Sequence, residues 1–106
     1  RADKLRTEAR ELFAEARRLM GNSRALLRRA TQLDAEAKEK LQLAGTVAKA
    51  GEKKAAKEIR KSAAAIKKSA FKARKEANKL SKKAAKLRSK GKKLIKKANK
   101  IDPDGN

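Results

Sequence analysis

Apolar residues in the first half of the chain recur at the spacing of an α-helix. Over residues 2–20 they fall alternately three and four positions apart, at Ala2, Leu5, Ala9, Leu12, Ala16 and Leu19, with Phe13 and Met20 widening the stripe. This period predicts an amphipathic helix. Gly21-Asn22-Ser23 combines a C-cap glycine with N-cap residues, so we expect a break there. A second stripe covers residues 26–44, and Gly45 and Ala50-Gly51 are further expected break points.

The second half follows a strict seven-residue repeat. One position holds only small residues, and the position three residues later holds mainly Ile and Leu: Ala56, Ala63, Ala70, Ala77, Ala84, Gly91 and Ala98, then Ile59, Ile66, Ala73, Leu80, Leu87, Leu94 and Ile101. Lysine occupies the other side in two rows, Lys54, Lys61, Lys68, Lys75, Lys82 and Lys96, and Lys72, Lys79, Lys86, Lys93 and Lys100. Residues seven apart lie on the same side of a helix, so this pattern predicts a small, tight apolar face opposite a lysine face.

An internal repeat bears on how the helices are connected. Shifting the sequence by 68 positions aligns residues 1–34 with 69–102 and matches charged positions, including Lys4/Lys72, Arg6/Arg74, Glu8/Glu76 and Asp34/Asp102. Because this shift is twice 34 residues, we expect one all-α domain of three antiparallel helical hairpins, over 1–34, 35–68 and 69–102, with a terminal turn at 103–106. The hairpins would form a bundle or a short array.

The unbroken heptad pattern of residues 56–101 leaves an alternative open. It allows one long helix that folds back on residues 2–44, giving one long hairpin of two extended helices. Gly91 separates the two architectures, since replacing it by alanine should destabilise a chain that turns there and stabilise a helix that continues through it.

The charge of the chain is high and uneven. Its 106 residues include 33 Lys and Arg against 12 Asp and Glu, a net charge of +21. Residues 1–50 carry 12 basic and 7 acidic side chains, whereas residues 51–106 carry 21 and 5. Polyanions are therefore the expected partners of the second half. Glu8, Glu11 and Glu15 are expected to form surface ion pairs with Arg10, Arg17 and Arg18.

Several kinds of chemistry have no residues to support them. Cysteine and histidine are absent, which excludes disulfides, thiolate nucleophiles, haem ligation and imidazole catalysis, and leaves no zinc ligands of the usual kind. No nucleophile has a base beside it, so we expect no enzyme activity, no cofactor and no small-molecule substrate. No apolar run approaches 18 residues, and RADKLRTEAR lacks the apolar core of a signal peptide, which predicts a soluble chain without indicating its location.

Three resemblances add expectations. The ending Ala98-Asn99-Lys100-Ile101-Asp102-Pro103, with small and apolar residues at Leu43, Ala44, Val47, Gly51, Ala56 and Ala63, resembles the tetratricopeptide repeat, which implies an array of helical hairpins. The segment 47–61, VAKAGEKKAAKEIRK, looks like the basic hairpin of a small-subunit ribosomal protein, which implies binding to ribosomal RNA. The regular pattern, the short turns and the absence of Cys, His, Trp and Tyr look like a designed (de novo) helical protein.

The densest basic segment is the candidate binding site. No acidic residue occurs between Glu76 and Asp102, and the expected polyanion-binding residues are Lys82, Lys83, Lys86, Arg88, Lys90, Lys92, Lys93, Lys96, Lys97 and Lys100. Contacts to RNA or DNA phosphates, or to heparin-like sugars, would give affinity without sequence specificity. Base stacking is not expected, because Phe13 and Phe71 are the only aromatic residues and are predicted to lie in the core.

Two other functions remain open. The chain would serve as a helical scaffold without a ligand if its charge only maintains solubility, and self-association is compatible with its apolar stripes. Alternatively, residues 82–101 would form a cationic amphipathic helix on the surface of an anionic membrane.

Overall fold

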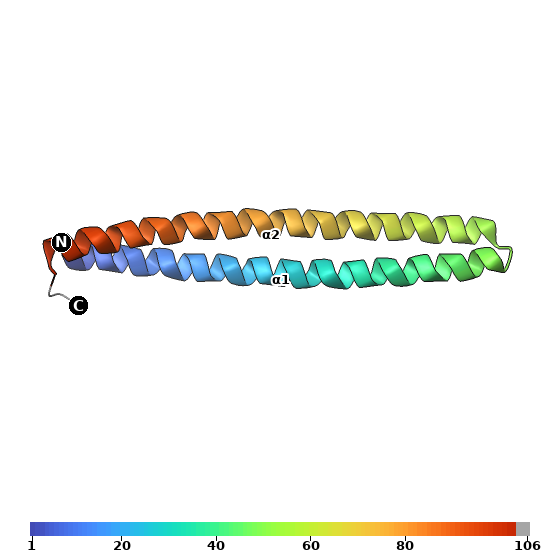
Figure 1. Ribbon diagram of the computed structural model, residues 1–106, viewed down its shortest axis with the longest axis horizontal. Helices are drawn as coiled ribbons and strands as arrows, with labels where there is room; N and C mark the ends of the chain where they lie inside the picture. The colour runs from blue at the N-terminus through green and yellow to red at the C-terminus, as the bar shows by residue number, and fades with distance from the viewer. Residues whose placement is uncertain (104–106) are drawn as a thin grey trace. The chain divides into compact units, whose positions relative to one another are not determined.

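Two α-helices account for nearly all of residues 1–103, which are the residues that the computed structural model describes. Helix α1 spans Ala2–Lys49 and helix α2 spans Lys53–Ile101 (Figure 1). No strand occurs in this described part of the chain, so the expected all-α class is confirmed and the connectivity is that of a helical hairpin. Of the expected turn at 103–106, only Pro103 is described; residues 104–106 lie outside the described residues.

Contacts divide the chain into two units. The end unit comprises Arg1–Arg24 and Asn78–Asn106, and the turn unit comprises Ala25–Ala77. In the end unit the start of α1 packs against the end of α2. In the turn unit the second half of α1 packs against the first half of α2, and the connecting turn joins these two segments. Each unit is therefore a pair of antiparallel helical segments.

A seam of small residues holds the helices together in each unit. In the end unit the buried positions seven residues apart are Ala2, Ala9, Ala16 and Ser23 on α1, and Ala84, Gly91 and Ala98 on α2. In the turn unit they are Ala30, Ala37 and Ala44 on α1, and Ala56, Ala63, Ala70 and Ala77 on α2. The predicted small, tight face is confirmed. Small side chains at a contact allow helix axes to approach closely.

Larger apolar side chains flank this seam. In the end unit Ala16, Leu19 and Ala84 form a buried cluster, with Met20, Leu80 and Leu87 packed against it. In the turn unit Ala30, Leu33 and Ala70 do the same, with Ile66 and Ala73 beside them. Apart from Leu19 and Leu33, the buried apolar residues of the described chain are alanines. The fully buried contact is thus made mainly by alanine, which also has the highest helix propensity.

The prediction of three hairpins over 1–34, 35–68 and 69–102 is wrong, as is the tetratricopeptide-like array. The chain continues as helix through Gly21, Gly45 and Gly91, which matches the alternative of one hairpin of two extended helices. A glycine inside a helix costs about 1 kcal/mol relative to alanine, and the packing of helix against helix on both sides of each glycine offsets this cost. Ser23 also takes the buried seam position seven residues after Ala16, so a break at Gly21 would interrupt the seam.

Only the break expected at Ala50-Gly51 is confirmed, and its backbone geometry explains why. Gly51 has a φ of 89°, which glycine adopts without the strain that other residues incur. Its amide donates to the carbonyl of Ala48 at 3.0 Å, and the Glu52 amide donates to that of Val47 at 3.1 Å, the two bonds of a Schellman motif. The Glu52 carbonyl then accepts the amide of Ala56 at 3.0 Å and begins α2.

The internal repeat has a different meaning from the predicted one. Residues 1–34 lie on α1, whereas residues 69–102 cover α2 up to its end and Asp102, so each helix carries one copy. Each unit contains the same cross-helix ion pair, Arg6 with Asp102 in the end unit and Arg74 with Asp34 in the turn unit. Two of the charged matches in the repeat, Arg6/Arg74 and Asp34/Asp102, are thus the positions that join two similar helical segments.

Arg6 also closes the C-terminal end of α2. Its Nη2 donates to the main-chain carbonyl of Asp102 at 2.7 Å and to Oδ1 of Asn99 at 3.4 Å, and the Arg6 side chain is only 10% exposed. A cation at this position satisfies a carbonyl that has no partner within the helix and interacts favourably with the helix dipole. Pro103 follows, and proline cannot continue a helix.

Candidate functional site

The ten predicted polyanion-binding residues lie on α2 within the end unit, and all ten are exposed. Among residues 1–103, none of them belongs to an ion pair. Lysine and arginine are good helix formers, so this segment stays helical although it is strongly basic. The structure brings the ten side chains onto one helical segment but spreads them around more than one side of it.

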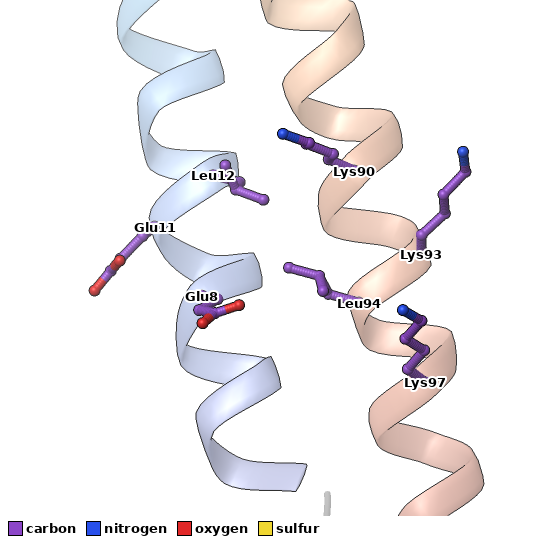
Figure 2. A pocket seen from close by; sticks show the side chains of 7 residues that line it. All are labelled: Glu8, Glu11, Leu12, Lys90, Lys93, Leu94 and Lys97. Carbon is purple, nitrogen blue, oxygen red and sulfur yellow. The ribbon is translucent and has the colours of Figure 1, made fainter. Parts of the chain in front are cut away.

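One group borders α1 and faces acidic residues. Lys90, Lys93 and Lys97 share a groove of about 510 Å³ with Glu8 and Glu11, and Leu12 and Leu94 also line it. We call this the Glu/Lys groove. Figure 2 shows Leu12 and Leu94 pointing toward each other between the two helices, whereas Glu11 and Lys93 point away from the gap. The positive potential of these lysines is therefore reduced by the neighbouring carboxylates.

The other side of the seam in the end unit has a different charge pattern. Arg17, Met20 and Arg24 from α1 and Arg88 from α2 line a second hollow, of about 330 Å³, which we call the arginine hollow. Glu8 of the groove precedes the seam residue Ala9 by one position, whereas Arg17 and Arg24 of the hollow each follow a seam residue by one position. The groove and the hollow therefore lie on opposite flanks of the seam. No acidic residue lines this hollow in the described chain.

Arg88 takes part in a third, shallow hollow on α2. This one is lined by Ser81, Ala85, Arg88, Ser89 and Lys92. The two hollows adjoin at Arg88, which lines both, and the hollow on α2 adds the two serines Ser81 and Ser89. Hydroxyl and guanidinium groups both donate hydrogen bonds to anions.

Sequence reasoning missed Arg17 and Arg24 as site residues. It assigned Arg17 and Arg18 to ion pairs with nearby glutamates; Arg18 does pair with Glu15 at 2.6 Å, but Arg17 is in no ion pair within the described residues. The signal that could have revealed them is their spacing of seven, which places Arg17 and Arg24 in one row on α1. That Arg88 lies opposite this row depends on how the helices pair.

The two phenylalanines behave differently. Phe13 is half-buried, and its ring lies where a side chain at Gly91 would be, with Cε1 2.8 Å from the position of a Cβ. Phe71 is 66% exposed, so its prediction as a core residue is wrong. It follows the seam residue Ala70 by one position, and the turn of about 100° per residue carries its side chain away from α1.

No described helix carries a stretch long and apolar enough to cross a membrane. The edge of α2 that would have to contact a lipid surface, including Ala84 and Leu87, packs against Ala16 and Leu19 of α1.

Comparison with known proteins gives no match: neither a family model, nor a curated protein, nor a solved structure shows significant similarity to this chain.

Proposed function

We propose that the protein is a non-catalytic, basic helical module that binds the phosphate backbone of RNA or DNA electrostatically and without sequence specificity. The observation that carries the proposal is a helical segment, residues 77–101, that has eleven Lys and Arg residues and no Asp or Glu. Ordinary solvated helix faces mix both signs of charge, because like charges three or four residues apart repel each other. A polyanion would remove that repulsion.

The spacing of the basic side chains suits an extended polyanion. Lysines in one row recur about 10.5 Å apart along α2, since each of seven residues rises about 1.5 Å. They therefore reach different phosphates of one strand instead of competing for a single phosphate. Each phosphate contact releases condensed counterions, which favours binding by entropy.

The composition of this surface also indicates what it does not read. Its basic side chains are long and flexible, and none of the ten is an aromatic residue on which a base could stack. Sequence-specific recognition of single strands uses such groups. The interaction is therefore with the backbone, and affinity is expected to follow charge density and not sequence.

The first experiment is fluorescence anisotropy with labelled RNA, labelled duplex DNA and heparin as competitor, at 50 and 200 mM salt. If 6–10 phosphates are contacted, affinity should fall by roughly 10³–10⁵ between the two salt concentrations, and RNAs of different sequence should bind equally. Absence of binding at 50 mM salt would contradict the proposal and leave a scaffold without a polyanion partner.

A matched pair of variants locates the surface. The first replaces Lys82, Lys86, Lys93, Lys96 and Lys100 of the end unit by glutamine, and the second replaces Lys54, Lys57, Lys67, Lys68 and Lys72 of the turn unit. Both remove five exposed charges from α2. We expect the first variant to bind at least tenfold more weakly than the second; equal losses would show that net charge alone decides binding.

A measurement with anionic vesicles distinguishes binding to nucleic acid from the alternative of binding to a membrane surface. Binding to anionic vesicles through residues 82–101 would require the seam edge of α2 to leave α1. We therefore expect the first variant to lose RNA binding without any change in the low affinity for vesicles, measured by co-sedimentation.

A further inference from the structure

The arginine hollow contains three cations that the fold itself does not neutralise. Arg17, Arg24 and Arg88 come from two helices and line the hollow together with Met20, and no carboxylate lines it in the described residues. Three of the other eight arginines have acidic partners: Arg6 pairs with Asp102, Arg18 with Glu15 and Arg74 with Asp34. Within residues 1–103, the three arginines of the hollow belong to no ion pair.

Packing does not explain this convergence. Met20 contacts the Ala16, Leu19 and Ala84 cluster, so it completes the apolar contact between the helices at this level. The three arginines are exposed and line the same hollow. Bringing three guanidinium groups around one hollow costs electrostatic repulsion, and an anion in the hollow would convert that cost into attraction.

The residue type indicates which anion. A guanidinium group presents a planar fork of N–H donors that matches two oxygens of one phosphate, whereas lysine acts as a point charge. All three basic residues of the hollow are arginines. On α2 every other basic residue of the end unit is a lysine, whereas on α1 Lys4 is the only lysine among the basic residues of this unit. The three arginines of the hollow favour tetrahedral oxyanions held by paired hydrogen bonds over loosely held counterions.

The neighbouring hollow on α2 provides further hydrogen-bond donors. Arg88 is shared with the depression that Ser81, Ser89 and Lys92 also line, where hydroxyl and ammonium donors are available to a second anionic group. Two adjoining hollows with a shared arginine match successive phosphates of one strand, because these are linked through a single sugar.

We propose that Arg17, Arg24 and Arg88 form the phosphate anchor of the end unit, which holds one phosphate of a nucleic-acid strand while Ser81, Ser89 and Lys92 contact the next. This inference rests on the proposed polyanion-binding function and deepens it. No acidic residue of the described chain lines this anchor. The lysines of the Glu/Lys groove contribute less, because Glu8 and Glu11 compete for them.

The test keeps the charge of the chain constant. The variant R17K/R24K/R88K preserves net charge and removes the guanidinium forks. The control R10K/R28K/R29K makes the same chemical change at three exposed arginines outside the hollow. Circular dichroism checks that both variants keep the helical content of the wild type.

We expect R17K/R24K/R88K to bind labelled RNA and duplex DNA at least tenfold more weakly than wild type, with an unchanged salt slope, because the number of cations is the same. The control should remain within twofold of wild type. The inference is overturned if wild type binds and both variants bind equally well, an outcome that leaves the proposed function intact. A loss confined to heparin would also overturn it, because the sulfate groups would then be the ligand. If wild type does not bind at all, the proposed function itself fails.

Discussion

The end unit and the turn unit use the same means of pairing helices but present different surfaces. Both have a seam of alanines and one Arg–Asp pair across the helices. The end unit has 18 basic and 6 acidic residues, a net +12, and the turn unit has 15 and 6, a net +9. In the turn unit both helices carry acidic residues, with Glu58 and Glu76 on α2. In the end unit, α2 has none before Asp102.

The exposed apolar residues also differ. Leu27, Leu41, Leu43 and Phe71 of the turn unit are all more than a third exposed, whereas Ile101 is the only such large residue in the described part of the end unit. The comparison teaches that seam and surface are set independently in this chain. One seven-residue pattern fixes helix pairing, and the positions that it leaves free carry basic groups in one unit and mixed apolar and charged groups in the other.

The largest expected effect tests whether the two seams are equivalent. Ala84 of the end unit and Ala70 of the turn unit are both fully buried. Replacing either by leucine forces a larger side chain between closely packed helices and should cost about 2–3 kcal/mol of unfolding free energy. Thermal unfolding followed by circular dichroism measures this. Ala85→Leu is the control. Ala85 is next to Ala84 but exposed, so this substitution should cost less than about 0.5 kcal/mol of unfolding free energy. A large loss at only one of the two alanines would show that only one unit depends on its seam.

The second prediction compares the stability contributed by the two cross-helix ion pairs, Arg6–Asp102 and Arg74–Asp34. The Arg6 side chain is 10% exposed and bonds a main-chain carbonyl, whereas that of Arg74 is 44% exposed. Arg6→Ala should cost about 2 kcal/mol, because a buried charged hydrogen bond is lost and the carbonyl of Asp102 loses its partner. Arg74→Ala should cost less than about 1 kcal/mol, as expected for an exposed ion pair. Urea unfolding of the two variants under identical conditions gives the comparison, and an equal or larger cost at Arg74 would contradict it.

The smallest effect concerns two glycines inside the helices of the end unit. A Cβ at Gly21 meets nothing within 4 Å, so Gly21→Ala should stabilise the protein by about 0.5–1 kcal/mol through helix propensity. At Gly91 the same change places a Cβ 2.8 Å from Cε1 of Phe13, which must move. We expect Gly91→Ala to show no gain in melting temperature, and the double change with Phe13→Leu to recover it. A gain in Gly91→Ala alone would mean that the ring moves away without cost.

That last prediction also corrects the sequence-based use of Gly91 as a test of architecture. The helix does continue through Gly91, but alanine is not expected to stabilise it, because glycine there makes room for a ring from the other helix. Helix propensity can be judged from one segment of sequence, whereas the space available to a Cβ depends on what lies opposite.

Much of the fold was predictable from local pattern. The seven-residue repeat predicted the buried seam of α2, and Ala50-Gly51 was identified as a turn, which its left-handed Gly51 confirms. The other glycines misled the prediction, because a glycine signals a possible end without indicating whether the seam continues beyond it. Ser23 showed that it does, being a small residue at the correct position, but serine was read as an N-cap.

The candidate site divides in the same way. The exposure of the ten basic residues of α2 followed from their positions outside the alanine seam. The convergence of Arg17 and Arg24 with Arg88, and the opposition of Glu8 and Glu11 to Lys90 and Lys97, did not. Both depend on which residues of α1 lie beside which residues of α2.

The sequence by itself determined that the chain is helical, that one face of each helix is small and buried, and that the second helix is strongly basic. These properties depend on side chains within a few turns of one another, where period and propensity act. The tertiary structure alone decided that the two copies of the repeat pair with each other within one hairpin, and which cations meet carboxylates and which meet other cations. Those outcomes depend on contacts between residues about 40 to 96 positions apart in sequence, such as Arg74 with Asp34 and Arg6 with Asp102, and no local pattern specifies them.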